Sequence, residues 1–172
     1  LPARQVAGDY YDFISGPNGH LGMVVADVSD KGMPAALFMA LSRSIVRASM
    51  DPSLSPAGSI QRANRLICQD STSGMFITLF YALLDPQVGS VCYVNAGHNP
   101  ALFFQHGKRP GQGAMSRLGR TGMALGVEAD KGKGRPDAGV EAFRLPPEIP
   151  AAVTGVLREA HYEGPVWLHL VK

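Results

Sequence analysis

An apolar run that ends in a carboxylate is the feature that most limits how this chain can fold. Residues 20–27, "HLGMVVAD", are apolar almost throughout and have the length of one strand, which is typical of a strand buried on both faces. In the next segment, "SDKGMPAALFMALSRSIVRASM", Pro34 stands at what would be the first helical position, where the fixed φ of proline is tolerated. We therefore expect a central strand that leads straight into a helix, with Asp27 at the junction.

Two helices are predicted after this strand. The first carries apolar side chains at helical spacing, at Leu37, Phe38, Leu41 and Ile45. The segment "DPSLSP" interrupts the pattern, and residues 55–70 resume it. The apolar positions expected on one face of the second helix are Ile60, Ala63, Leu66 and Ile67. The sequence therefore predicts a helical hairpin.

The rest of the chain is predicted to be mainly β-structure. Residues 75–85, 90–97 and 101–105 have strand patterns separated by short turn-like breaks, which favours an antiparallel meander. A short strand is expected near residues 115–118 among glycine-rich loops, and a last helix and strand within residues 146–172. Strands and helices in this order indicate an α+β fold rather than alternating βαβ units. A doubly wound nucleotide-binding sheet is therefore disfavoured.

Length and composition limit the class of protein. The 172 residues, 45% of them hydrophobic, suit one globular domain over residues 1–172, and the abrupt start suggests a piece of a longer chain with an N-terminal regulatory region. A net charge of +2 with scattered basic residues lacks the electrostatic footprint of a nucleic-acid binder. No run approaches the roughly 20 apolar residues that span a bilayer, and no signal pattern is present. We expect a cytoplasmic domain without a membrane or nucleic-acid partner.

The two cysteines fit that compartment. Cys68 and Cys92 are single residues inside apolar segments, so we interpret them as small buried hydrophobic side chains rather than as a disulfide or a metal site.

Four aspartates stand near the start of the chain: Asp9 and Asp12 in the strand-like run "GDYYDFI", Asp27 at the end of the predicted strand 20–27, and Asp30 just after it. A carboxylate at the end of an apolar strand needs a partner, because removing an unpaired charge from water is costly. The partner could be a basic side chain, the N–H groups of the following helix or a hard divalent cation. Asp27 or Asp30 alone could simply cap the helix. Asp9 and Asp27 together, each at a strand end beside a glycine-containing loop, suit Mg²⁺ or Mn²⁺.

Five blocks carry a resemblance to a known family. "GDYYDF", "VVADVSDKGMPAALFMA", "GMFITLFYALLD", "NAGHNPALFF" and "GMALGV" occur between residues 2 and 127 in the order and spacing of the metal-dependent serine/threonine phosphatases, the PPM family, in their bacterial SpoIIE/RsbU branch. The resemblance implies an α-β-β-α sandwich of two mainly antiparallel sheets flanked by helices. It also implies two Mn²⁺ or Mg²⁺ ions, a metal-bridging water as nucleophile with no catalytic side chain, and a phosphoprotein as substrate.

The resemblance also implies roles for single residues. Asp9 resembles the first metal-binding acid, and Asp27 resembles the acid that bridges both metals, with the Val28 carbonyl as an adjacent oxygen ligand. Asp12 and Asp30 are left as residues that support the site or cap the helix, because Asp12 does not alternate with Asp9 and Asp30 stands where relatives commonly carry glycine.

His98 lies in the "GHNP" corner and has two readings. The corner is first a turn, with Gly97 and Pro100 shaping the backbone, and His98 is otherwise a catalytic acid or a substrate contact. No zinc cluster, phosphate-binding P-loop or serine nucleophile elbow stands in the sequence.

The two remaining acids of the family pattern are not intact. "PDAGVEAF" is a degenerate form of one motif and leaves Asp137 as its candidate ligand, while "HYEGP" leaves only Glu163 for the other. Fewer carboxylates would hold the cations more weakly.

This departure keeps three hypotheses open. The first is a metal-dependent protein phosphatase acting on a phosphoprotein such as an anti-sigma-factor antagonist in bacterial signalling, controlled by a fused or separate sensor or receiver domain. The second is a catalytically impaired phosphatase-like module that binds a partner, and the third is a purely structural domain. Oligomeric state, including a homodimer, is left open.

Overall fold

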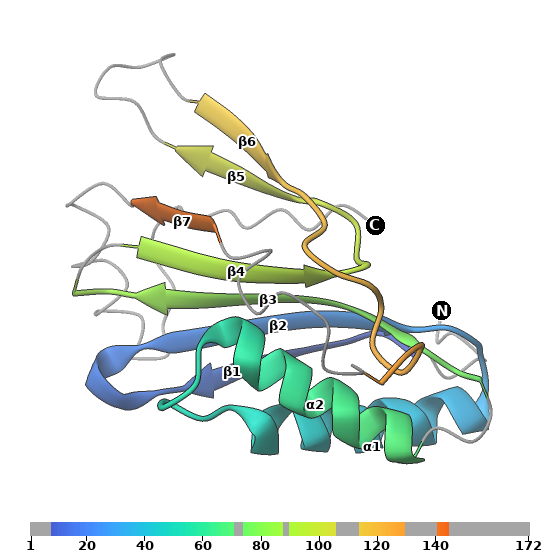
Figure 1. Cartoon of the computed structure of the whole chain (residues 1–172). Helices are drawn as coiled ribbons and strands as arrows, with labels where there is room; N and C mark the ends of the chain where they lie inside the picture. The colour runs from blue at the N-terminus through green and yellow to red at the C-terminus, as the bar shows by residue number, and fades with distance from the viewer. Residues whose placement is uncertain (1–7, 71–73, 88–89, 106–113, 130–140, 145–172) are drawn as a thin grey trace, which may run out of the picture.

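A computed structural model describes residues 8–70, 74–87, 90–105, 114–129 and 141–144. Within these ranges the chain forms two antiparallel sheets and two α-helices (Figure 1). The larger sheet has the strand order β1-β2-β3-β4-β7, and the smaller pairs β5 with β6. The strands are β1 (Tyr10–Ser15), β2 (Leu21–Val28), β3 (Ile77–Asp85), β4 (Ser90–Ala96), β5 (Ala101–Gln105), β6 (Ala114–Leu118) and β7 (Glu141–Arg144). The helices are α1 (Met33–Ser49) and α2 (Pro56–Asp70), and a 3₁₀ turn, η1 (Pro17–Gly19), joins β1 to β2.

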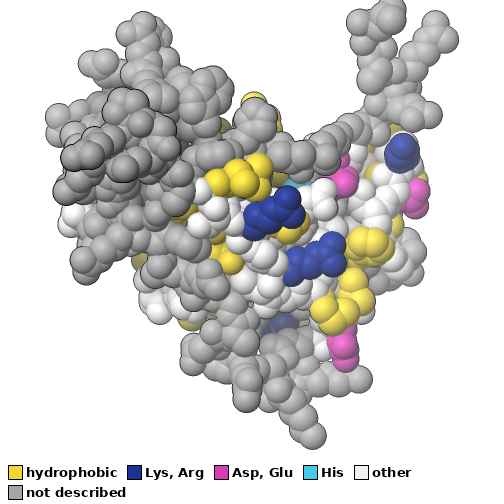
Figure 2. All heavy atoms as spheres, turned by 90° about the horizontal axis from the view of Figure 1, so that it is seen from above, with side chains coloured by type: hydrophobic (Ala, Val, Ile, Leu, Met, Phe, Trp, Pro, Cys, Tyr) yellow, Lys and Arg dark blue, Asp and Glu magenta, His cyan; other side chains and the backbone are white. Residues whose placement is uncertain are grey.

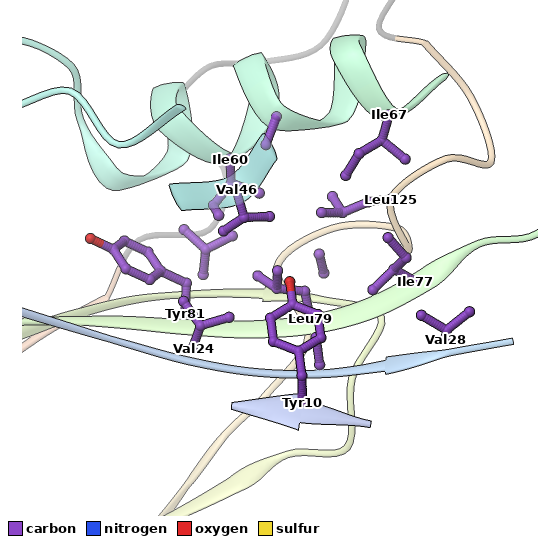
Figure 3. Packing of buried hydrophobic residues seen from close by; sticks show 14 of the residues in the cluster. Tyr10, Val24, Val28, Val46, Ile60, Ile67, Ile77, Leu79, Tyr81 and Leu125 are labelled. Carbon is purple, nitrogen blue, oxygen red and sulfur yellow. The ribbon is translucent and has the colours of Figure 1, made fainter. Parts of the chain in front are cut away.

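Both helices lie against one face of the larger sheet. Helix α1 contacts β1 and β2, and α2 contacts β3 and β4. Their buried side chains meet those of the strands in one apolar core, and Figure 3 shows Val46, Ile60 and Ile67 above Val24 and Leu79. Burial of this apolar area is the main force that holds the helices on the sheet.

A second apolar cluster covers the opposite face of the same sheet. Phe80, Ala82 and Leu84 of β3 pack there with Phe103 of β5 and Leu118 of β6. Because β3 contributes side chains to both clusters, it is buried on both faces, which explains its almost unbroken apolar sequence. The layers are therefore helices, large sheet and small sheet.

The predicted α+β class with antiparallel sheets is confirmed, and so are the central strand at residues 20–27 and the helical hairpin after it. Helix α1 begins directly after Gly32, with Pro34 in its first turn as the sequence predicts. The predicted last helix and closing strand lie outside the described residues.

Some details differ from the expectations. Strand β5 does not continue the meander but pairs with β6 in the smaller sheet. In α1, Leu37 and Leu41 are 65% and 42% exposed, and the buried face is instead Ala35, Phe38, Ser42, Val46 and Ser49. In α2, Leu66 was expected on the buried face but is 39% exposed. Strand β7, which was not predicted from the sequence, pairs with β4. In each case packing against a distant element decided the outcome.

Cys68 and Cys92 are free thiols that are only partly buried, so they are less buried than expected. On the face seen in Figure 2, the Lys and Arg side chains of the described residues lie in separate patches among hydrophobic and uncharged groups. Among the described residues, no helix combines the length and the apolar character that crossing a membrane would need.

Candidate functional site

Asp9, directly before β1, lies beside Asp27 of β2. The register pairs Tyr10 with Ala26, so the residues before and after them, Asp9 and Asp27, face each other at the same end of the sheet. Side chains along β2 alternate between the two faces of the sheet. Val24, Ala26 and Val28 lie in the core beneath the helices, so Asp27 lies on the opposite face. Both aspartates are exposed. The structure thus brings together the two carboxylates that the sequence singled out.

The Val28 carbonyl lies close to the chain just before Asp9. A Cβ atom added at Gly8 would lie 3.0 Å from the Cβ of Val28 and 3.2 Å from its carbonyl oxygen. A side chain at Gly8 would therefore crowd that oxygen, so the glycine keeps the start of β1 and the end of β2 in close approach.

His98 lies on the same side of the sheet as these carboxylates. Thr78 of β3 pairs in register with Asp27, and its hydroxyl lies 2.8 Å from Nδ1 of His98. Burial lowers the pKa of His98, and the carboxylate of Asp9 opposes that shift. Burial therefore favours the neutral form of the imidazole, and Thr78 holds its Nδ1.

Asn95 fixes the backbone around His98. This residue is fully buried, and its side-chain oxygen accepts a hydrogen bond from the His98 N–H at 2.8 Å while its amide group donates to the Leu118 carbonyl at 3.2 Å. Its backbone N–H donates to the Thr121 hydroxyl at 2.8 Å, and its carbonyl accepts from the N–H groups of Thr121 and Gly122. These bonds join the end of β4, the end of β6 and the His98 corner into one unit.

Asp12 faces the helices rather than Asp9 and Asp27. It is 7% exposed, and its carboxylate accepts hydrogen bonds from Arg47 Nε at 2.9 Å, Arg47 Nη2 at 2.7 Å and Arg43 Nη2 at 3.1 Å. These bonds lower the pKa of Asp12, with Arg47 as the largest cause. The carboxylate of Asp12 is therefore bound to two arginines near the end of α1 and does not cap the start of that helix.

Asp30 is exposed and its carboxylate accepts a hydrogen bond only from the next residue's N–H, at 2.9 Å, among the contacts described for it. The residue at the N-terminal cap of α1 is Gly32, with no side-chain cap, so the capping role proposed for Asp30 is wrong. Asp30 also has a φ of 137°, a strained value for a residue other than glycine. Asp137 and Glu163 lie outside the described residues.

The donor types fit a hard divalent cation, since two carboxylates and a carbonyl oxygen are ligands that Mg²⁺ and Mn²⁺ prefer. The number of such ligands is smaller than a centre for two divalent cations needs. Within the described ranges, no three His, Cys, Asp or Glu side chains are grouped so that they could hold a metal ion. The described residues thus bring together the carboxylates of Asp9 and Asp27 and the carbonyl oxygen of Val28.

Thr78 and Asn95 were missed by the sequence reasoning. Thr78 sits inside an apolar strand, and a threonine in a strand carries no functional signal because its β-branched side chain suits strands in general. For Asn95, the clue was a polar amide directly before "AGHNP" at the end of an apolar strand, a position where a buried side chain needs partners.

Comparison with known proteins adds sequence and fold relationships. The profile of the family described as Stage II sporulation protein E (SpoIIE) matches residues 17–149. Phosphoserine phosphatase RsbU of Bacillus subtilis (strain 168) is 30% identical over 130 residues, which are 76% of this chain and 37% of RsbU. The chain therefore spans well under two thirds of this relative.

Solved structures show the same fold at low identity. The RsbU and RsbW domains of Rv1364c from Mycobacterium tuberculosis align with a TM-score of 0.64 at 22% identity, over 85% of this chain and 38% of that one. RsbX in complex with magnesium aligns with a TM-score of 0.58 at 14% identity, over 84% of this chain and 64% of that one.

Proposed function

Since this chain belongs to the SpoIIE family, we propose that it is the phosphatase domain of a longer protein and that it removes phosphate from serine or threonine of a phosphoprotein with the help of Mn²⁺ or Mg²⁺. The observation that carries the proposal is the side-by-side placement of Asp9 and Asp27 at one end of the sheet. RsbU, which is 30% identical to this chain, is named a phosphoserine phosphatase, and this supports the proposed reaction. The structure of RsbX in complex with magnesium supports the proposed cofactor.

Asp9, Asp27 and the Val28 carbonyl would hold the cations. Two such cations, when bound, lower the pKa of a shared water and offset the charge that develops on the phosphoryl oxygens. No side-chain nucleophile is then required. His98, held by Thr78 and Asn95, would hydrogen-bond a phosphoryl oxygen or the leaving hydroxyl group. Asp137 and Glu163 are the candidates for further ligands.

The substrate we propose is a phosphoprotein that resembles an anti-sigma-factor antagonist, in a bacterial signalling system within the cytoplasm. Support comes from the relatives RsbU and RsbP, both named phosphoserine phosphatases, and from the RsbW domain that accompanies an RsbU domain in the Mycobacterium tuberculosis protein. A sensor or receiver domain elsewhere in the longer protein would control it.

Asp27→Asn tests the proposal. This change removes the charge of the proposed bridging ligand at almost constant shape, so Mn²⁺-dependent hydrolysis of an aryl phosphate and of a phosphoserine peptide should fall to background while the circular dichroism spectrum stays unchanged. Asp12→Asn should reduce the rate far less, and Asp70→Asn, at an exposed position at the end of α2, should leave it unchanged. Turnover of Asp27→Asn at the wild-type rate would refute the metal assignment.

Among the described residues, too few metal-binding side chains lie together to hold a metal ion. This favours one alternative, a module that has lost catalysis and binds the unphosphorylated partner. In that case the wild-type chain shows no Mn²⁺-dependent turnover but retains an antagonist protein in a binding assay, and Asp27→Asn retains it equally well.

A further inference from the structure

We infer that Asp12, Arg43 and Arg47, here called the Asp12 clamp, position the strand that carries Asp9 and thereby set the metal centre. The inference rests on the proposed function and adds three positioning residues to it. None of the three touches the proposed metal, and they act through β1 and α1.

The clamp is a dense and directional ionic contact. Arg47 donates to both carboxylate oxygens of Asp12, and Arg43 adds a third bond to Oδ1. Nη2 of Arg47 also donates to the Phe13 carbonyl at 2.8 Å, so the same guanidinium group binds both the Asp12 side chain and the backbone of β1. The Asp12 side chain is 8% exposed, whereas those of Arg43 and Arg47 are 49% and 50% exposed. A buried carboxylate with bidentate guanidinium contact is held in one geometry.

Strand β1 has fewer neighbours than the central strands, so the clamp is a substantial part of what holds it. It lies at the edge of the larger sheet and pairs only with β2 among the described strands. Its outward side chains Tyr11 and Phe13 are 72% and 57% exposed, so they bury little surface. The inward side chains, Tyr10 and Asp12, lie against the helix layer. An edge strand with one hydrogen-bonded neighbour opens more easily than a central strand.

Helix α1 links the clamp to the other carboxylate. The helix starts at Met33, a few residues after Asp27 and Val28, and presents Arg43 and Arg47 one turn apart near its other end. It is therefore joined by the chain to the strand that carries Asp27 and by the clamp to the strand that carries Asp9. Asp12 lies three residues along β1 from Asp9. A shift of α1 would change the spacing of the two carboxylates.

The test compares Arg47→Gln with Arg62→Gln as a matched control. Arg62 is 48% exposed and also contacts an aspartate, Asp51 at 3.7 Å, but far from β1 in the sequence. Two measurements are made well below the unfolding temperature: Mn²⁺ binding by calorimetric titration, and amide hydrogen exchange of β1 in the metal-free protein. Arg47→Gln should weaken Mn²⁺ binding about tenfold, the low end for residues that support metal ligands. It should also speed exchange over β1.

Graded variants separate positioning from stability. Arg43→Gln, which removes one bond, should weaken Mn²⁺ binding less than Arg47→Gln, and Arg47→Lys should fall between Arg47→Gln and wild type because it keeps the charge and loses the fork geometry. Arg62→Gln should match wild type in both measurements. If the variants only lower the urea midpoint, with Mn²⁺ affinity and β1 exchange equal to those of Arg62→Gln, the inference is overturned.

Asp27→Asn distinguishes this failure from failure of the proposed function. Loss of Mn²⁺ binding in Asp27→Asn without any effect of Arg47→Gln overturns the clamp and leaves the metal centre standing. Unchanged Mn²⁺ binding in Asp27→Asn refutes the metal centre and, with it, the positioning role.

Discussion

At the residue scale, aspartates that look alike in the sequence occupy different environments. Asp9 and Asp27 are exposed on one face of the sheet, Asp12 is buried between two guanidinium groups on the other, and Asp30 stands in a strained turn. The side chain's direction in the strand and the partners it meets decide its chemistry, because the carboxylate itself is the same.

The Asp12 clamp predicts a specific loss of stability in acid. Because the folded-state pKa of Asp12 is lowered, its contribution is fully present above the unfolded-state pKa of about 4 and is lost as the pH falls through the lower folded-state value. Asp12→Asn should therefore reduce the free energy of unfolding at pH 7 by about 2 kcal/mol. This difference from wild type should shrink below pH 4. Urea unfolding between pH 7 and pH 2.5 measures this. A difference in the free energy of unfolding between the two proteins that stays constant from pH 7 to pH 2.5 would contradict the prediction.

Gly97 gives a second prediction at this scale. Its φ is +72°, and an added Cβ would lie 2.9 Å from the backbone nitrogen of Ala124. Gly97→Ala should reduce the free energy of unfolding by about 2 kcal/mol, since it adds both backbone strain and a clash with main-chain atoms. Gly119→Ala, where an added Cβ meets nothing within 4 Å, is the matched control and should change stability little. Thermal unfolding measures the stability of both variants, and equal losses in the two would contradict the prediction.

At the element scale, α1 shows that apolar residues at helical spacing do not identify the buried face. Phe38 is 6% exposed, whereas Leu37, its neighbour, is 65% exposed. The helix could offer either of two apolar stripes to the sheet, and Ala35, Ser42 and Ser49 are small enough to let its backbone approach. Close approach buries more of Phe38 and Val46, which explains why that stripe faces the core.

This difference predicts the cost of two adjacent substitutions. Phe38→Ala should reduce the free energy of unfolding by about 3 kcal/mol, because it leaves a cavity between helix and sheet. Leu37→Ala should change it by less than about 0.5 kcal/mol, since the side chain is largely in water already. Urea denaturation at pH 7 measures both. Similar losses for the two variants would mean that Leu37 packs against another part of the longer protein or another copy.

At the scale of the whole molecule, the number of carboxylates limits the metal centre. Two dications need several anionic ligands to offset their charge, and the described residues bring two carboxylates and one carbonyl oxygen together. The chain also spans only 37% of RsbU, so the activity of a whole relative need not follow from this part.

We therefore predict weak Mn²⁺ binding and low turnover for this chain. Asp137 and Glu163 are poor replacements for the two later acids of the family pattern, since Glu163 is followed by Gly164 and Pro165 instead of further carboxylates. The double variant Gly164→Asp and Pro165→Asp should strengthen Mn²⁺ binding in calorimetric titration. Two tight Mn²⁺ sites in the unmodified chain would contradict the prediction and would assign Asp137 or Glu163 to the metal shell.

Local features of this protein could be predicted from its sequence. The apolar period identified β2 and β3, Pro34 marked the start of α1, and the glycine-rich corner marked the turn at His98. These features depend on backbone sterics and on side chains a few residues apart, so a short window of sequence contains their causes. The same local logic singled out Asp9 and Asp27, because each ends or begins a strand.

Contacts between distant groups could not be predicted in this way. The partners of Asp12 lie 31 and 35 residues away, and Thr78 meets His98 across 20 residues, at separations where no periodicity in the sequence links two side chains. The pairing of β5 with β6 and of β7 with β4 likewise depended on which sheet edge and which apolar face remained uncovered. Such contacts are selected by the total burial and hydrogen bonding of the folded chain, a quantity that no single segment contains.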